Sequence, residues 1–285
     1  MAGTRSNIAT ARRPSSCIGQ PSLGGCQSSI VLSPPPNRPD PATYSQAPLV
    51  TANDPVTWAS PDVSLYAPPT YDGNSWQFDM NWFLNRALIT VRNRSNSVPA
   101  VNTVVAVSGS ELGIGLPRGP IFTQLVSLAA GEVRQLSVPF EYTIIDIGSD
   151  VGAHGWETGL ALFVDISHPY DADTDNNHGE CVTALMLRKP LIPGGEVVLF
   201  GIDTLAIKLG NTTGSPKNYA LSILPNSVSA QVAPAQITVA AGDVQTARLS
   251  FTRPLSHGVS TNVTLIARDP GGNLLGGMTV QLFFD

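Results

Sequence analysis

Charged residues are scarce in this sequence, since Asp, Glu, Lys and Arg make up only 13% of its 285 residues. That is about half of the usual share. Coiled coils and helical bundles need many charged helix formers and few helix breakers. The low charge, together with 26 glycines and 24 prolines, therefore excludes both classes. The net charge of −5 argues against a basic surface for DNA or RNA, and we expect no nucleic-acid partner.

Cysteines and long apolar runs are also few. Three cysteines, Cys17, Cys26 and Cys181, do not support a disulfide framework, although the first two could close a small loop or remain free thiols. No run approaches the roughly 18 apolar residues of a membrane span, so we expect none. The N-terminal arginines precede no apolar stretch of the kind found in a signal peptide. We expect a soluble chain in an assembly at the cell surface, outside the cell or on a virion.

The first quarter of the chain is rich in proline. Residues 1–69 hold 12 of the 24 prolines, and proline favours extended backbone without amide donors. We predict an extended arm over residues 1–59 that either stays disordered or orders against a neighbouring subunit. The apolar run Ile30, Val31 and Leu32 is the part that such an arm would dock.

The rest of the chain consists of short β-like runs separated by turn residues, which predicts an all-β fold. The first set of runs covers residues 63–66, 87–91, 101–107, 134–140, 160–166 and 182–187. The second set covers residues 196–200, 204–209, 219–224, 236–239, 246–251, 262–267 and 278–284. Residues 121–128 fit a strand or a helix. We predict two tandem immunoglobulin-like β-sandwiches, at residues 60–189 and 190–285.

Several segments of the first sandwich resemble the bacterial CARDB-type repeat, a cell-adhesion-related domain. The similar segments are Ser60-Pro-Asp-Val63, Ala87 to Ser95, Val98-Pro-Ala100, Leu128-Ala-Ala-Gly-Glu132 and Asp171 to Asn177. The resemblance covers about residues 60–188 and implies a fold used in display or adhesion. The second sandwich is similar to generic bacterial immunoglobulin-like modules, with Val239-Ala-Ala-Gly-Asp243 as its matching turn.

The densest polar cluster precedes the last strand of the first sandwich. Its oxygen-bearing side chains, spaced as Ca²⁺ ligands can be, are Asp165, Asp171, Asp173, Asp175 and Asn177. The start of the run imitates an EF-hand loop, but Asn176 stands where a glycine is needed. The alternatives are a solvated hairpin with Asx turns and a zinc site through His168 and His178. Apart from this possible Ca²⁺, we expect no cofactor.

Seven of the 19 aromatic residues lie within 26 positions. They either cover the first sandwich or pack into its core, or they face outward, where aromatic rings bind protein partners or sugars. The candidate partner-binding residues in and around this cluster are Trp58, Tyr66, Tyr71, Trp76 and Trp82.

Scanning for catalytic motifs finds no nucleophile elbow, zinc-protease pair or phosphate-binding loop in the sequence. We therefore expect no enzyme activity. The sequence favours a non-catalytic structural or adhesive subunit of a larger assembly, in contact with other protein subunits through its arm, its β-edges and its aromatic cluster. The alternative is an accessory module that binds a surface glycan.

Overall fold

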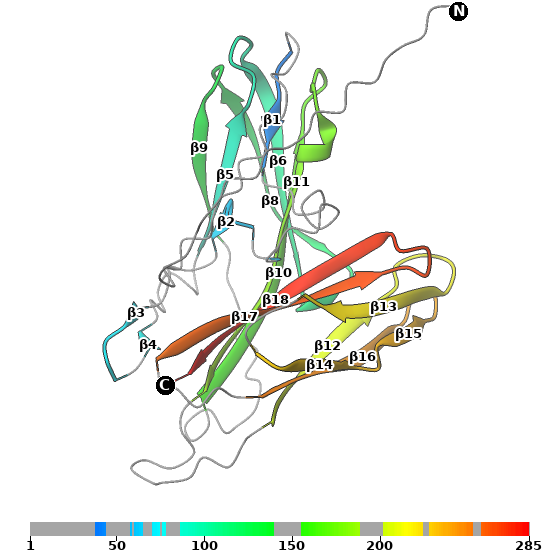
Figure 1. Cartoon of the computed structure of the whole chain (residues 1–285). Coiled ribbons are helices and arrows are strands. Elements are labelled where there is room, and N and C mark those ends of the chain that lie inside the picture. The colour runs from blue at the N-terminus through cyan, green and yellow to red at the C-terminus, as the bar shows by residue number, and fades with distance from the viewer. Residues whose placement is uncertain are drawn as a thin grey trace, which may run out of the picture. The chain divides into compact units, whose positions relative to one another are not determined.

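The computed structural model describes residues 38–43, 58, 60–64, 70–74, 76–77, 86–139, 155–188, 202–224, 228–252 and 258–284. These residues form an all-β structure, and the only helical turn among them is a short 3-10 helix, η1, at Thr174–Asn176. We call residues 38–188 the first half and residues 202–284 the second half. Figure 1 shows the strands of both halves.

One eight-stranded sheet runs through both halves, in the order β15-β13-β17-β18-β11-β10-β6-β8. Its first-half strands are β6 (Ala100–Ser110), β8 (Gly119–Leu128), β10 (Gly155–Ser167) and β11 (His178–Arg188). Its second-half strands are β13 (Lys217–Ile223), β15 (Gln236–Val239), β17 (Val259–Arg268) and β18 (Leu274–Phe284). Each half contributes four strands in an equivalent arrangement: β15, β13, β17 and β18 of the second half correspond to β8, β6, β10 and β11 of the first half. The halves meet where β11 and β18 pair in parallel.

A second sheet completes each half. In the first half it comprises β1 (Pro41–Ala42), β2 (Val63–Ser64), β5 (Arg86–Asn93) and β9 (Val133–Pro139). In the second half it comprises β7 (Gly113–Ile114), β12 (Ile202–Gly210), β14 (Ala230–Ala233) and β16 (Val244–Thr252). A separate hairpin pairs β3 (Thr70–Tyr71) with β4 (Trp76–Gln77). Strand β7 comes from the first half but pairs with β12 of the second half.

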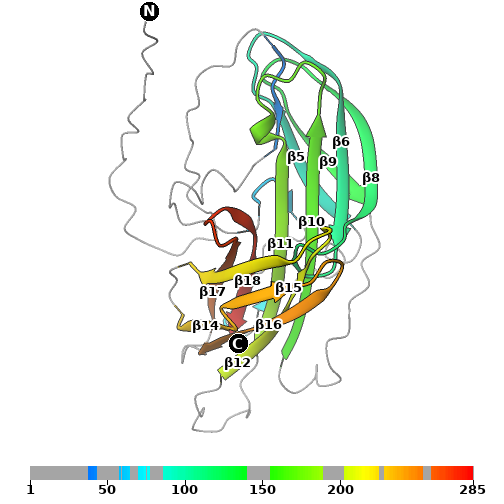
Figure 2. The same cartoon turned by 90° about the vertical axis from the view of Figure 1, so that its right-hand side faces the viewer.

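The two hydrophobic cores lie on opposite faces of the shared strands. Successive side chains of a strand point to opposite faces. On β10, Leu162 and Val164 pack into the first-half core (core A), whereas Ala161 and Phe163 pack into the second-half core (core B). The long strands β10 and β11 (Figures 1 and 2) therefore serve both cores at once.

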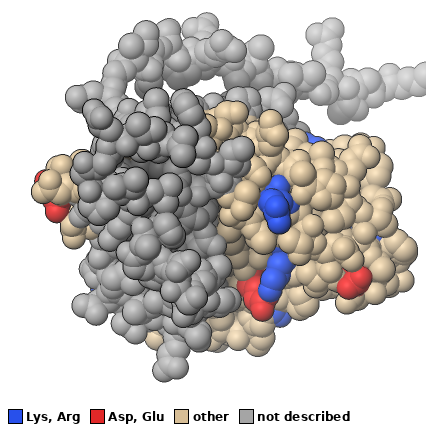
Figure 3. Space-filling model, turned by 90° about the horizontal axis from the view of Figure 1, so that it is seen from below, with Lys and Arg blue, Asp and Glu red and all other residues tan. Residues whose placement is uncertain are grey.

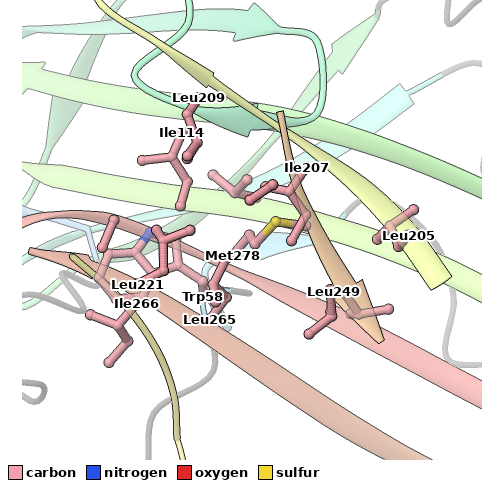
Figure 4. Close-up of a cluster of buried hydrophobic side chains, with 14 of the residues drawn as sticks. Trp58, Ile114, Leu205, Ile207, Leu209, Leu221, Leu249, Leu265, Ile266 and Met278 are labelled. Carbon is pink, nitrogen blue, oxygen red and sulfur yellow. The ribbon is translucent and has the colours of Figure 1, made fainter. Parts of the chain in front are cut away.

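Trp58 sits where β11 and β18 diverge. Its backbone N–H donates to Thr279 Oγ1 of β18 at 2.6 Å, and its carbonyl accepts from the Val182 N–H of β11 at 3.0 Å. The indole ring is 2% exposed and belongs to core B (Figure 4). Ile114 of β7 enters the same core. Core B of the second half is thus completed by first-half residues.

An equivalent turn, built around a buried asparagine, lies at the end of the second sheet in each half. Asn93 and Asn211 are each 2% exposed, and each donates its side-chain amide to two backbone carbonyls across the turn. Both asparagines lie in Asn-x-Ser/Thr patterns, and their burial assigns them to structure rather than to glycosylation. Both turns end in Ala-Ala-Gly segments, where Gly131 and Gly242 adopt φ of 70° and 74°, which suits glycine.

The structure confirms the all-β prediction and most of the expected strands, but the predicted arm is wrong in part. Residues 41–42 of that arm form β1, an edge strand on β5, where prolines are tolerated because no ladder amide is needed. Trp58, also assigned to the arm, is a core residue. The ambiguous residues 121–128 lie in strand β8. The run 196–200 and the predicted boundary between residues 189 and 190 lie outside the described residues.

Replacing Trp58 by alanine should destabilise the protein by about 3–5 kcal/mol, because the cavity is large and lies in core B. The measurement is the urea midpoint of unfolding followed by circular dichroism. Tyr170→Ala is the matched control, since this aromatic side chain is 71% exposed and its loss should cost less than about 0.5 kcal/mol. Equal midpoints for wild type and Trp58→Ala would contradict the assigned position of the indole.

Candidate functional site

The free edge of β8 is the strongest candidate for a contact surface. Strand β8 ends the eight-stranded sheet, and within the described residues it pairs only with β6. Its ten residues, Gly-Pro-Ile-Phe-Thr-Gln-Leu-Val-Ser-Leu, include no charged side chain. The side chain of Leu125 is 62% exposed near the middle of the strand. Natural edge strands usually carry charges or are short, because an open edge is a template for another strand.

The neighbouring strand β9 forms an edge of the other first-half sheet. Val133 at its start is 63% exposed. Arg134, however, is a charged residue on this strand, and its guanidinium pairs with Glu132 at 2.6 Å. At the opposite end of the eight-stranded sheet, β15 has only four residues. Among the described edges, β8 is therefore both long and uncharged.

The described part of one face of the molecule carries few charged side chains (Figure 3). The face drawn in Figure 3 carries a few scattered Lys, Arg, Asp and Glu side chains between uncharged ones. Uncharged surfaces associate through backbone hydrogen bonds and apolar contact rather than through long-range attraction. An edge strand offers both of these short-range interactions.

Of the five predicted partner-binding aromatics, the structure describes the side chains of Trp58 and Tyr71, and neither is an exposed ring. Trp58 is buried, so the expectation that it faces a partner is wrong. Tyr71 packs closely over Gly258, where a Cβ would lie 2.6 Å from the ring. Trp76 lies in β4, but its side chain is outside the described part of the chain. The other predicted contact residues also lie outside it: Tyr66, Trp82, Ile30, Val31 and Leu32.

The five predicted calcium ligands separate into two groups. Asp171 and Asp173 form successive Asx turns, because Asp171 Oδ1 accepts from the Asp173 N–H and Asp173 Oδ1 from the Asp175 N–H. Asn177 donates to Asp171 Oδ2 at 2.7 Å. Asp165 points instead to His178. Among the described residues, no group of three or more His, Cys, Asp or Glu side chains is placed to hold a metal ion. Asx turns at this hairpin are the alternative interpretation of the sequence.

A second polar group surrounds His178 at the start of β11. Its Nδ1 lies 2.6 Å from Asp165 Oδ1, and its Nε2 lies 2.7 Å from Glu180 Oε1. Burial opposes the charged imidazolium, but the two carboxylates outweigh it and raise the pKa of His178 to about 9. His178 in turn lowers the pKa of Asp165, through their hydrogen bond first.

The network around His178 continues to the junction of the two halves. Glu180 Oε2 accepts from the indole N–H of Trp58 at 2.6 Å. The guanidinium of Arg118 lies 3.6 Å from Glu180 and 3.4 Å from the ring centre of Phe163. Burial favours neutral Glu180, but its hydrogen bonds from His178 and Trp58 and the nearby positive charges leave its pKa lowered. Through Glu180, this network holds the indole N–H of Trp58 in place.

Sequence patterns alone did not single out β8 or the His178 network. The missed signal for β8 was a ten-residue stretch without charge, which period-based reasoning assigned ambiguously because Ile121, Leu125 and Leu128 also match a helical spacing. His178 was named from the sequence only as an alternative zinc ligand, and its pairing with Asp165 and Glu180 was not predicted. Their link to Trp58 spans more than 120 positions and has no local signature.

No model of a known protein family matches the sequence, and no curated protein matches it. The resemblance to the CARDB-type repeat therefore stays a prediction. Within the described residues, no helix is long and apolar enough to cross a membrane.

Solved structures with some likeness include WR4, a member of the MSP family from C. elegans, at TM-score 0.23 and 15% identity, covering 30% of this chain and 85% of WR4. The secreted serine protease VesC from Vibrio cholerae gives 0.24 and 13%, covering 65% of this chain and 45% of VesC. A protein of unknown function from Porphyromonas gingivalis W83 gives 0.20 and 14%, covering 70% of this chain and 91% of that protein. None of these likenesses bears on function.

The stability of the protein should fall as the pH rises from about 6.5 to about 9. The pKa of His178 is 6.5 when unperturbed and about 9 in the fold, so the folded state holds this proton more tightly than the unfolded chain does. The stabilisation is complete below pH 6.5 and is lost as the pH rises through 9. Because 37% of the side chain is exposed, water weakens the effect.

His178→Gln tests the assignment. Urea unfolding between pH 6 and 10 should show wild type more stable than the variant at pH 6, with the difference shrinking towards pH 10. A difference that stays constant across this range would mean that the charge on His178 does not stabilise the fold.

Proposed function

We propose that this protein is a non-catalytic structural subunit that assembles by adding a strand of a second copy to the free edge of β8. The observation that carries the proposal is the long, uncharged edge of β8 with Leu125 exposed on it. A strand added there gains backbone hydrogen bonds, each contributing about 0.5–1.5 kcal/mol net. Several such bonds, together with apolar contact at Leu125, act against the entropy that is lost on association.

The strand that we propose as the donor is the apolar run Ile30, Val31 and Leu32 of another copy. It is β-branched or aliphatic at each position. Like strand β8, it carries no charge. It precedes Arg38, the first described residue, by only a few positions, so a copy that donates it stays close to its acceptor. Donation from one copy to the next makes a head-to-tail contact, which gives a ring or a filament.

The fold fits this role. Each half pairs a sheet built on β5–β9 or β12–β16 with four strands of the shared sheet, which supports an assignment as two immunoglobulin-like sandwiches. Such sandwiches, like the CARDB-type repeat that the first half resembles, serve widely as display and contact modules. The fused sheet adds stiffness, because relative motion of the halves would break the β11–β18 pairs.

Leu125→Lys should weaken assembly at least tenfold, because a lysine on an edge strand opposes strand addition. The measurement is the concentration dependence of molar mass by sedimentation equilibrium. Val244→Lys, at a residue that is 43% exposed in the second half, is the matched control and should assemble like wild type. A monomeric wild type at all concentrations, or a Leu125→Lys variant with unchanged assembly, would refute the use of this edge.

Removing residues 1–36 should abolish assembly without unfolding the protein. This truncation keeps β1 and its contacts with β5, so circular dichroism and the melting temperature should match those of the full chain. A synthetic peptide of residues 27–35 should bind the truncated protein and should not bind truncated Leu125→Lys. Truncated protein that still assembles would show that the arm does not donate the strand.

A further inference from the structure

A groove opens at the end of the first half, away from the edge strand residues discussed above. Three segments form its walls, namely residues 38–39, residues 98–102 and residues 168–171. The groove has a volume of about 700 Å³, which lies within the range of small-molecule sites. Prolines and valines are among its lining residues, together with side chains that can bind a polar ligand: Arg38, Asn102, Tyr170 and Asp171.

His168 positions the aromatic ring of Tyr170 at the groove. The backbone N–H of Tyr170 donates to His168 Nδ1 at 3.2 Å, so Nε2 carries the proton and donates to the Val101 carbonyl at 3.0 Å. The His168 and Tyr170 rings meet edge to face, with centroids 6.1 Å apart. Both ring nitrogens of His168 are thus used in positioning, whereas Tyr170 stays 71% exposed.

Asn102 lies on the opposite wall in an unusual backbone conformation. Its φ of 57° places it in the left-handed region, which non-glycine residues seldom adopt. The β6–β8 register shifts between Ala100 and Thr103, which releases Val101 and Asn102 from the ladder. The Asn102 N–H is satisfied by Ser127 Oγ at 3.1 Å. Asparagine is one of the few non-glycine residues that adopt this region readily, and the exposed Asn102 side chain offers both a donor and an acceptor.

The two charged side chains of the groove, Arg38 and Asp171, differ in the number of hydrogen bonds that they make within the protein. Both oxygens of Asp171 accept hydrogen bonds, from Asn177 and from the Asp173 N–H. Arg38 is exposed and has no ion pair or hydrogen bond within the described part of the chain. Among the described residues, the groove therefore offers one guanidinium without a partner, a group that binds carboxylates through two parallel hydrogen bonds.

We propose that this groove binds a saccharide that carries a carboxylate, with the Tyr170 ring against the sugar's C–H face and Arg38 on the carboxylate. Asn102 can exchange hydrogen bonds with the sugar hydroxyls, each of which both donates and accepts. A pyranose has an apolar face and a polar rim, and the groove combines an exposed ring, apolar proline and valine side chains, and polar groups from separate segments of the chain. Hexuronates and sialic acids share this chemistry.

The competing occupant is a proline-rich peptide, since such peptides also bind to aromatic residues in grooves. A polyproline ligand needs a row of aromatic ridges, however, whereas Tyr170 is the single aromatic ring that lines this groove apart from His168. The polar side chains of Arg38 and Asn102 would have no partner on proline side chains. The observations therefore favour the saccharide.

Saturation-transfer NMR with the full chain tests the site. Methyl glucuronide and N-acetylneuraminic acid are the two acidic probes, and methyl glucoside is the neutral one. We expect at least one acidic probe to bind about tenfold more tightly than methyl glucoside. Tyr170→Ala and Arg38→Gln should each weaken that binding about tenfold. Tyr170→Phe should retain it, as should Arg248→Gln, which removes an exposed arginine of the second half.

Three outcomes would overturn the proposal. The first is that neither acidic probe binds, and the second is that methyl glucoside binds as well as they do. The third is that a peptide of residues 33–37 binds at the groove and displaces the sugar probe, which would assign the groove to the proline-rich segment. Leu125→Lys should leave sugar binding unchanged, so that failure of the assembly proposal and failure of this one are told apart.

Discussion

The parallel pairing of β11 with β18, held at its fork by Trp58, is the interaction on which the rest of the structure depends. Two adjacent parallel strands taken from equivalent positions of two similar halves place those halves on opposite faces of the sheet. That geometry explains why alternate residues of β10 enter different cores. It also leaves a wedge where the strands separate, and the indole fills it. Gly277 is required beside the wedge, because a Cβ there would lie 2.4 Å from the indole ring.

The same pairing determines which edges remain open. Strands β11 and β18 would each be the exposed edge of an isolated half, but they cover each other. The ends of the shared sheet then fall to β8 and β15, and β15 is short. Fusion of the halves thus removes two edges internally and concentrates strand-addition capacity on one long, uncharged strand. A subunit with one such edge and a separate donor segment has a direction, which suits head-to-tail assembly better than symmetric pairing.

The sequence predicts what is local and misses what is distant. The alternation of Leu205, Ile207 and Leu209, or of Val263, Leu265 and Ala267, reports burial at period two, and these strands were correctly predicted. The prolines near residue 40 suggested an arm. An edge strand also tolerates proline, however, and Pro41 lies in such a strand, β1. Trp58 was named as a candidate partner-binding residue because it lies among other aromatics, a cluster that the sequence allows either to pack into a sandwich or to face outward. Only its partners on β11 and β18, more than 120 residues away, determine its burial.

The register shift between β6 and β8 connects the two proposed surfaces physically. At this shift Val101 and Asn102 leave the ladder and line the groove. The backbone N–H of Asn102 donates instead to Ser127 Oγ, near the end of β8. The irregular end of the β6–β8 ladder therefore belongs to the groove, whereas its regular middle, around Leu125, presents the open edge. Because each surface uses a different stretch of the strand, a ligand in the groove does not compete with a strand added at the middle. In a head-to-tail assembly each copy would then present its own groove, so weak individual binding could sum to strong attachment of the whole assembly.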